Sequence, residues 1–265
     1  IDPRRTGLPW ADIRPGPDEI TIGSGWRLQV ASPRSPQVLT AIDDLVRFLS
    51  EAMSVRLVVV WDENARPRSG TITVSEGADS ANGRLTPAGY RFAAGAGGIH
   101  LHGADSRGVL RAVWYLEDLL MLRGGPFVRQ DDRVREPRYS PRTTCAAWAF
   151  SGELTTPAPV FTDQHLSLIS HYGYDAIWLG WYPGSEANSE PPTRTMPGRT
   201  PVGTSYRPFT SRLRDLAERA EKYDLQIVIL YLAPHPADET RRRAMAEDAK
   251  RFLVEVPEVK TIVLL

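Results

Sequence analysis

Two segments in the first half of the chain carry apolar residues at spacings of three and four, the pattern of one helix face. The first stripe consists of Val38, Ile42, Leu45, Leu49 and Met53. The second consists of Val109, Val113, Leu116 and Leu120. Ser35 stands just before the first stripe, where its hydroxyl can cap a helix. The pattern therefore predicts two amphipathic helices, each of which needs a sheet to cover.

Short β-branched or alternating segments, separated by Gly and Pro, surround these two helices. In chain order they are ITIGSGWRLQV, RLVVVWD, GTITVSEG and GYRFAAGAGGIHLHG. This punctuation is typical of a small, mostly antiparallel sheet. Residues 19–135 are therefore expected to form an α+β domain with two helices on one face of a sheet. Residues 1–18, rich in Pro, Arg and Gly, are expected to be a lead-in, and residues 124–142 a connector.

Strands and helices alternate in the second half of the chain. Four segments, TTCAAWAF, DAIWLGWY, LQIVILYLA and KTIVLL, have the apolar composition of buried strands. Three helices are expected between them: one that Thr162 caps and Gly173 ends, one through residues 213–223, and one over residues 238–254. This alternation is typical of β/α units around a parallel sheet.

The length of the second half sets its expected architecture. A closed β/α barrel takes about 250 residues, and roughly half that number follows Arg142. An apolar last strand at residues 261–265 would also be an aggregation hazard at an open edge. Residues 136–265 are therefore expected to be the N-terminal half of a (β/α) barrel that is truncated after its fourth strand. An open four-stranded α/β domain is the alternative.

Composition and charge narrow the class of partner. Lys plus Arg and Asp plus Glu are both 32, and no long run of one sign occurs. This balance argues against a nucleic-acid or anionic-membrane partner and favours a neutral or sugar-like ligand. The single cysteine, Cys145, lies in an apolar segment and is expected to be a buried, inert thiol rather than a nucleophile. No cofactor is expected, and the oligomeric state stays open.

The sequence contains no apolar stretch of about 18 residues, so no membrane span is expected. Its first residues, IDPRRTGLPW, lack the apolar core of a signal peptide and an initiator Met. The chain is therefore expected to begin inside a longer gene product. A secreted and a cytoplasmic location both stay open.

A specific motif lies between Gly89 and Leu120. GYRF is followed by GIHLHGADSRGVLRAVWYLEDLL, and further on comes REPRYSPR. These segments resemble the small domain before the catalytic barrel in family 20 glycoside hydrolases, the β-N-acetylhexosaminidases, and in α-glucuronidase relatives. The pattern there is G-Y-x-L, an alternating strand, then G-x-D-x-R-G and a helix with L-x-x-L-L. The matching residues are Gly103, Asp105, Arg107, Gly108, Leu116, Leu119 and Leu120.

The resemblance covers about residues 20–142 and implies a glycoside hydrolase. The residues of the motif themselves are suited to building the fold rather than to catalysis. Gly103 and Gly108 fit a tight turn from a strand into a helix. Asp105 or Ser106 can cap that helix, and Arg107 can pair with a carboxylate. A structural role is therefore expected for these residues.

The second half departs from the family pattern. After the junction, hexosaminidases show R-G-x-x-x-D-x-x-R, whose last Arg grips the sugar. In the same register this chain has Arg142, then Ala147 and Phe150 in place of the Asp and the last Arg. The family's catalytic Asp-Glu pair follows barrel strand four, so the resemblance places the acids after Leu265. The catalytic residues are therefore unknown, and a broader glycoside hydrolase is expected, with a noncatalytic carbohydrate-binding or structural protein as the alternative.

Candidate ligand contacts follow the strands, because β/α barrels bind at the carboxyl ends of their strands. Aromatic faces stack on the C–H faces of sugar rings. The predicted substrate-binding residues are Trp148, Glu153, Trp181, Tyr182, Tyr231 and His235. An oligosaccharide or glycoconjugate is the expected ligand. The long loop 183–208 is a candidate binding loop, and Trp178 a candidate core residue.

The sequence gives weaker signals for catalytic carboxylates and for a metal site. Glu153 and Glu186 are the only carboxylates that closely follow the first two strands of the second half, and neither is assigned as the acid. His100 and His102 share one strand face, but no third ligand follows nearby, so no metal site is predicted.

Overall fold

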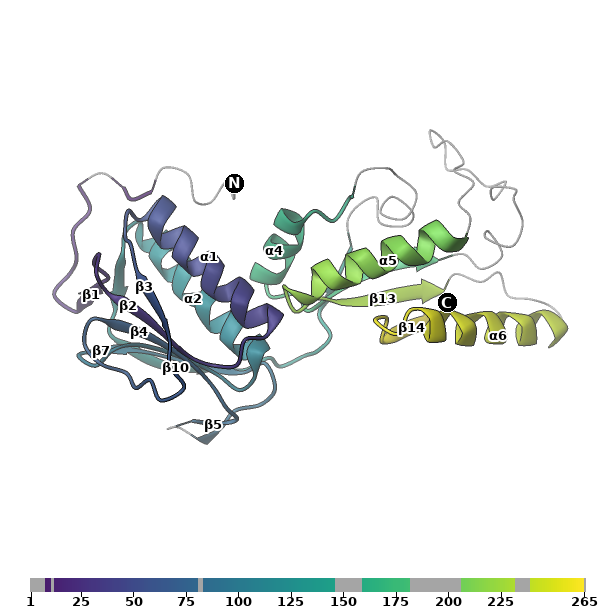
Figure 1. The fold of residues 1–265 in the computed structure, drawn as a ribbon, viewed down its shortest axis with the longest axis horizontal. Helices are drawn as coiled ribbons and strands as arrows, with labels where there is room; N and C mark the ends of the chain where they lie inside the picture. The colour runs from purple at the N-terminus through teal and green to yellow at the C-terminus, as the bar shows by residue number, and fades with distance from the viewer. Residues whose placement is uncertain are drawn as a thin grey trace. The chain divides into compact units, whose positions relative to one another are not determined.

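The computed structural model describes residues 8–10, 12–80, 83–145, 159–181, 206–231 and 239–264. The chain forms two compact units, Ile1–Ser140 and Pro141–Leu265 (Figure 1). Among the described residues, no helix combines the length and the apolar character needed to cross a membrane.

The first unit is built on a six-stranded sheet with the strand order β10-β7-β8-β4-β2-β3. The strands are β2 (Arg27–Ala31), β3 (Val58–Trp61), β4 (Thr71–Glu76), β7 (Tyr90–Gly95), β8 (Gly98–Gly103) and β10 (Asp131–Arg135). β2 pairs in parallel with β3 and β4, and β4 pairs in parallel with β8. Only the pairs of β7 with β8 and with β10 are antiparallel. The expectation of a mostly antiparallel sheet is therefore wrong, because the helix after β2 makes a crossover that returns the chain in the same direction.

Two helices cover one face of this sheet, as the apolar stripes predict. They are α1 (Pro36–Ala52) and α2 (Ser106–Arg123), which pack against each other (Figure 1). Ser35 caps α1, since its hydroxyl accepts a hydrogen bond from Val38 N at 3.2 Å. The core between helices and sheet is fully buried and includes Leu28, Leu45, Phe48, Ile72, Phe92, Leu101, Val113 and Leu116.

The segment expected to be a connector contains two strands. β9 (Phe127–Arg129) pairs antiparallel with β1 (Glu19–Thr21), and β10 forms one edge of the six-stranded sheet. The pattern missed β10 because its sequence, DDRVR, is mostly charged, which is typical of an edge strand exposed to water. A short hairpin of β5 (Asp79–Ser80) and β6 (Gly83–Arg84) completes the unit.

The G-x-D-x-R-G motif forms the turn from β8 into α2. Asp105 caps α2 by accepting from Gly108 N at 2.9 Å, and it also accepts from Ala88 N at 3.1 Å. Arg107 donates to the same carboxylate at 3.0 Å. A Cβ at Gly108 would overlap the carbonyl oxygen of Gly89. The expected structural role of the motif is confirmed, because it ties the start of β7, the end of β8 and the start of α2 together.

The second unit is a parallel sheet with the sequential order β11-β12-β13-β14. The strands are β11 (Thr143–Thr144), β12 (Ala176–Trp181), β13 (Gln226–Tyr231) and β14 (Thr261–Leu264). The helices are α4 (Asp163–His171), α5 (Tyr206–Glu221) and α6 (Glu239–Glu255). All three described pairings are parallel, so the predicted alternation of strand and helix around a parallel sheet is confirmed. No closed barrel is present among the described residues.

The three helices pack on one face of this sheet. The core comprises Phe161, Leu166, Ile169, Ile177, Leu179, Leu213, Leu216, Ala220, Ile227, Ile229, Val256 and Val259. β12 and β13 contribute only alternate residues to it, which is the signature of one strand face. Thr162 caps α4 as expected, since its hydroxyl accepts from His165 N at 3.2 Å. Cys145 is partly buried against the same core.

Arg142 and Asp175 join the starts of the first two strands of this sheet. Arg142 N donates to the Asp175 carboxylate, and Arg142 Nε lies 3.5 Å from Asp175 Oδ2. In return, Asp175 N donates to Arg142 O at 3.0 Å. Since Asp175 is buried, this pair fixes the amino-terminal edge of the sheet.

Candidate functional site

The carboxyl edge of the parallel sheet in the second unit is the candidate site. Trp181 ends β12 and is the register partner of Tyr231, which ends β13; Tyr231 is in turn the partner of Leu264 in β14. The three strands therefore end at one level. Open and closed parallel sheets both place ligands outside the carboxyl ends of their strands.

Of the six predicted ligand contacts, the structure describes the backbone of two. Trp181 and Tyr231 lie side by side on neighbouring strands at the carboxyl edge. The other four lie outside the described residues; they are Trp148, Glu153, Tyr182 and His235. Phe150, Glu186 and most of the loop 183–208 lie outside them as well. The ligand-binding role of all six stays a prediction.

Trp178, a candidate core residue, does not belong to the core between the sheet and its helices. Its neighbours Ile177 and Leu179 belong to the helix-facing core, and Trp178 does not. Because side chains alternate along a strand, partly buried Trp178 lies on the face away from the helices. That face becomes the interior when a parallel β/α sheet closes into a barrel. The alternation in DAIWLGWY was the signal that could have separated Trp178 from the core residues.

A polar cluster lies on the sheet of the first unit, on the face away from the helices. Ser75 Oγ lies 2.7 Å from His100 Nε2 and 2.8 Å from His102 Nδ1, and His102 Nε2 lies 2.9 Å from the carbonyl oxygen of Asp79. A carbonyl only accepts, so His102 carries its proton on Nε2. Ser75 therefore donates to His102 and accepts from His100, which gives one continuous chain of donors.

Burial keeps His100 neutral. Burial is the largest cause that lowers the pKa of His100, to about 4, and the neighbouring His102 ring and the Arg91 guanidinium act in the same direction. Asp132 opposes them, but Arg91 already binds it through two hydrogen bonds of 2.8 and 2.6 Å. The two histidines do share a strand face as expected, and Ser75 stands where their nitrogens converge.

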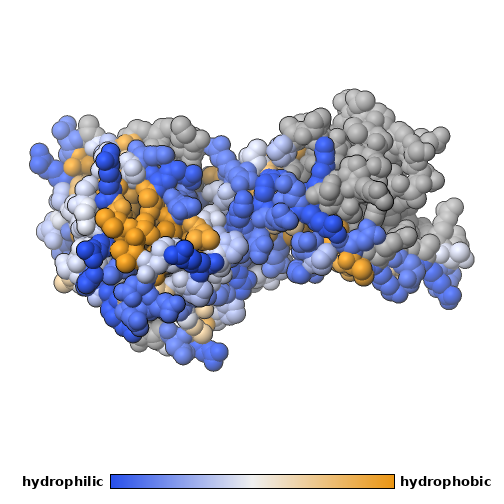
Figure 2. Space-filling model, in the orientation of Figure 1, coloured by the Kyte–Doolittle hydropathy of each residue, from blue (hydrophilic) through white to orange (hydrophobic). Residues whose placement is uncertain are grey.

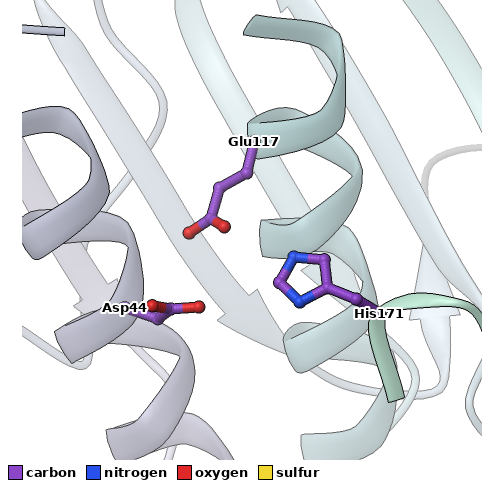
Figure 3. Close-up of side chains that lie close together, drawn as sticks. All are labelled: Asp44, Glu117 and His171. Atoms are coloured by element: carbon purple, nitrogen blue, oxygen red, sulfur yellow. The ribbon is translucent and has the colours of Figure 1, made fainter. Parts of the chain in front are cut away.

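Two buried acidic side chains lie between the helices of the first unit. Asp44 of α1 and Glu117 of α2 turn their carboxylates into the same space, with one oxygen of each within 4.8 Å of the other (Figure 3). Arg47 Nη2 binds Asp44 Oδ1 at 2.7 Å and offsets part of this charge. The helix pattern did not predict this pair, although Asp44 interrupts the apolar stripe between Ile42 and Leu45. It is a feature of the packing of α1 against α2.

Comparisons with known proteins give matches in structure alone. No protein-family model matches the chain, and no curated protein sequence matches it. A mutant Streptomyces plicatus β-hexosaminidase in complex with its product GlcNAc matches with a TM-score of 0.58 and 20% identity over 85% of this chain and 45% of that one. The Flavobacterium johnsoniae chitobiase matches with a TM-score of 0.66 and 12% identity over 97% of this chain and 43% of that one.

The fold is similar to that of the family 20 β-hexosaminidases. A GH138 enzyme that targets pectin rhamnogalacturonan II also matches, with a TM-score of 0.60 and 11% identity over 89% of this chain and 30% of that one. The fold is thus glycoside hydrolase-like, and the predicted family 20 likeness is confirmed at the level of fold. The chain spans less than half the length of each of these proteins. The likeness to α-glucuronidase relatives stays a prediction.

Proposed function

We propose that the chain is the N-terminal part of a glycoside hydrolase, in which the first unit is an accessory domain and β11–β14 are the first half of a (β/α) barrel. The sequential order of four parallel strands with three helices on one face carries this proposal. A doubly wound sheet reverses its strand order and covers both faces, whereas a barrel adds each strand in sequence and keeps its helices outside. The fold similarity to family 20 and GH138 enzymes supports the same function.

The proposed ligand site is the carboxyl edge of this half barrel, with an oligosaccharide or glycoconjugate as substrate. Trp181 and Tyr231 are register partners, so their Cα atoms stand about 5 Å apart on adjacent strands. An aromatic residue at the end of each of two adjacent strands can stack on the apolar faces of a saccharide. Trp148, Glu153, Tyr182 and His235 are proposed to add contacts from the loops at the same edge, with the catalytic acids in the second half of the barrel.

The substrate class is proposed more broadly than hexosamine. The Streptomyces plicatus neighbour holds GlcNAc, and the GH138 neighbour targets a pectin. This chain carries Ala147 and Phe150 where the hexosaminidase pattern has its Asp and sugar-gripping Arg. Both an N-acetylglucosamine oligosaccharide and a pectin oligosaccharide are therefore needed as probes, and the pattern favours a sugar other than N-acetylhexosamine.

Trp181→Ala in the full-length gene product tests the proposed site. We expect saccharide binding to weaken by roughly one order of magnitude, since a stacked aromatic is worth about 1–3 kcal/mol in base stacking, used here as a scale. Tyr172→Ala is the matched control, because Tyr172 is 65% exposed and precedes β12 at the opposite edge of the sheet. Isothermal titration with both probes measures the change. If the Trp181→Ala variant binds both probes as tightly as the parent does, the proposed aromatic site is wrong.

The alternative function is a noncatalytic carbohydrate-binding protein with a degenerate barrel, in keeping with the missing sugar-gripping Arg. Release of reducing sugar from the two probes by the full-length protein distinguishes the two functions. Binding without turnover would establish the alternative.

A further inference from the structure

The two edges of the six-stranded sheet differ in chemistry. β3 forms one edge, with the sequence VVVW, and its residues Val58 and Val59 are 55% and 36% exposed. Among the described residues, no strand pairs with the outer side of β3. Figure 2 shows an apolar patch over this part of the first unit, bordered by hydrophilic residues. A contiguous apolar patch of this kind is typical of an interaction surface.

The opposite edge shows what an unpartnered edge of this sheet looks like. β10 has the sequence DDRVR, so four of its five residues are charged. Charged side chains along an edge prevent pairing with another chain. β3 has no charge, proline or bulge within its span, so only one of the two edges carries the usual protection.

The backbone of β3 is in phase to accept a further strand. Val58 N donates to Trp26 O at 3.1 Å, and Asp62 N donates to Val30 O at 3.0 Å. Because a strand alternates the direction of its hydrogen-bonding groups, the even-numbered residues 56–62 face β2. The N–H and C=O groups of the odd-numbered residues Leu57, Val59 and Trp61 therefore point away from the sheet.

We propose that β3 is a self-association edge, on which two copies of the chain pair antiparallel about a twofold axis at Val59. In this register Val59 faces Val59 of the second copy, and Leu57 faces Trp61 in both directions. The outward groups of these residues can then form about six hydrogen bonds across the axis. Such a pairing is isologous and closed, so it stops at two copies.

Charge selects both the partner and the register. Arg56 precedes β3 and Asp62 follows it, so the edge is basic at one end and acidic at the other. Antiparallel pairing about Val59 places Arg56 of each copy opposite Asp62 of the other, on the same face of the joined sheet. Opposite charges directly across two strands are favourable, whereas a parallel pairing would bring like charges together. A second copy of this chain therefore complements the edge.

The pairing buries one short strand from each copy, at the small end of specific interfaces. Interfaces below about 1,200 Å² are typical of transient complexes. We therefore expect dissociation in the micromolar range, measured by sedimentation velocity of the 265-residue chain between about 1 and 200 µM. The mass should rise from 29.5 kDa toward twice that value across the series.

Three variants test the mechanism. Val59→Lys places two positive charges on the axis and should give a monomer at every concentration. Val59→Pro removes only an outward N–H, which an edge strand tolerates, and should weaken association at least tenfold. Val134→Lys is the matched control on the β10 edge, where Val134 is 40% exposed, and it should dimerise like the parent. Circular dichroism confirms that each variant is folded.

A charge reversal tests the register. Arg56→Asp should abolish the dimer, and adding Asp62→Arg to it should restore the dimer, because the exchanged charges face each other again. A folded parent that stays monomeric at about 200 µM would overturn the proposal and leave the edge to a different partner. The proposal also fails if Val59→Lys leaves the dimer intact, if Val134→Lys breaks it, if the double variant stays monomeric, or if open-ended aggregates form. None of these outcomes bears on the proposed sugar site.

Discussion

Replacing His100 by glutamine should remove a pH-dependent part of the free energy of unfolding. The pKa of His100 is lowered to about 4 by burial and by its neighbours, against about 6.5 for the unfolded chain. Because the folded pKa is the lower one, the contribution of His100 is complete above about pH 6.5 and is lost as the pH falls toward 4. Glutamine keeps an N–H that can donate to Ser75, so the network keeps its donor chain.

The size of the effect follows from the two pKa values. One pKa unit is worth about 1.4 kcal/mol, so His100 lowers the free energy of unfolding by at most about 2.5 kcal/mol between pH 7.5 and 4.5. Partial exposure of the ring to water reduces this value, and we expect about 1–2 kcal/mol. The pH-dependent loss should be smaller in His100→Gln than in the parent by this amount.

The assay combines two measurements. Urea unfolding at several pH values between 7.5 and 4.5 gives the free energy of unfolding of parent and variant, with His165→Gln in the second unit as the matched control. NMR titration of the five histidines gives the pKa directly, and the signal that disappears in His100→Gln assigns it. A His100 midpoint near 6.5, or equal pH dependence in all three proteins, would refute the reasoning.

Two further predictions concern the motif turn and activity. Gly108→Ala should destabilise the first unit by about 3 kcal/mol or more, because the added Cβ would overlap the Gly89 carbonyl oxygen. Gly97→Ala is the control and should cost about 1 kcal/mol or less, because no atom lies within 4 Å of its added Cβ. Similar melting temperatures of the two variants in thermal unfolding would contradict the packing argument. The 265-residue chain alone should hydrolyse no aryl glycoside, since both acids of the proposed mechanism lie in the second half of the barrel; hydrolysis that Glu153→Gln or Glu186→Gln abolishes would contradict this.

Local signals explain which parts of the fold could be predicted. The stripes of α1 and α2, the caps Ser35 and Thr162 and the β/α alternation are written in residues a few positions apart, and all are confirmed. The direction of strand pairing in the first unit was wrong because it depends on which strands become neighbours. β3 and β4 both flank β2, and no short-range pattern contains that order.

In the candidate sites too, local features could be predicted from the sequence, whereas contacts between distant residues could not. His100 and His102 could be placed on one face from their spacing, but their partner Ser75 is 25 and 27 residues away. The charged strand β10 gave no apolar pattern, although it completes one edge of the sheet. Trp181 and Tyr231 could be assigned to strand ends because each follows an apolar run. Which side chains meet at the carboxyl edge depends on the loops that follow those strands, and loop conformation has no periodic signal.

The proposed glycoside hydrolase function is tested most directly by a crystal structure of the full-length protein bound to an oligosaccharide. We predict a closed (β/α) barrel in which β14 pairs with a further parallel strand, with the sugar at the carboxyl edge, in contact with Trp181 or Tyr231 and beside a carboxylate from the second half. A sheet that stays open after β14, or a sugar bound away from the carboxyl edge, would contradict the proposal.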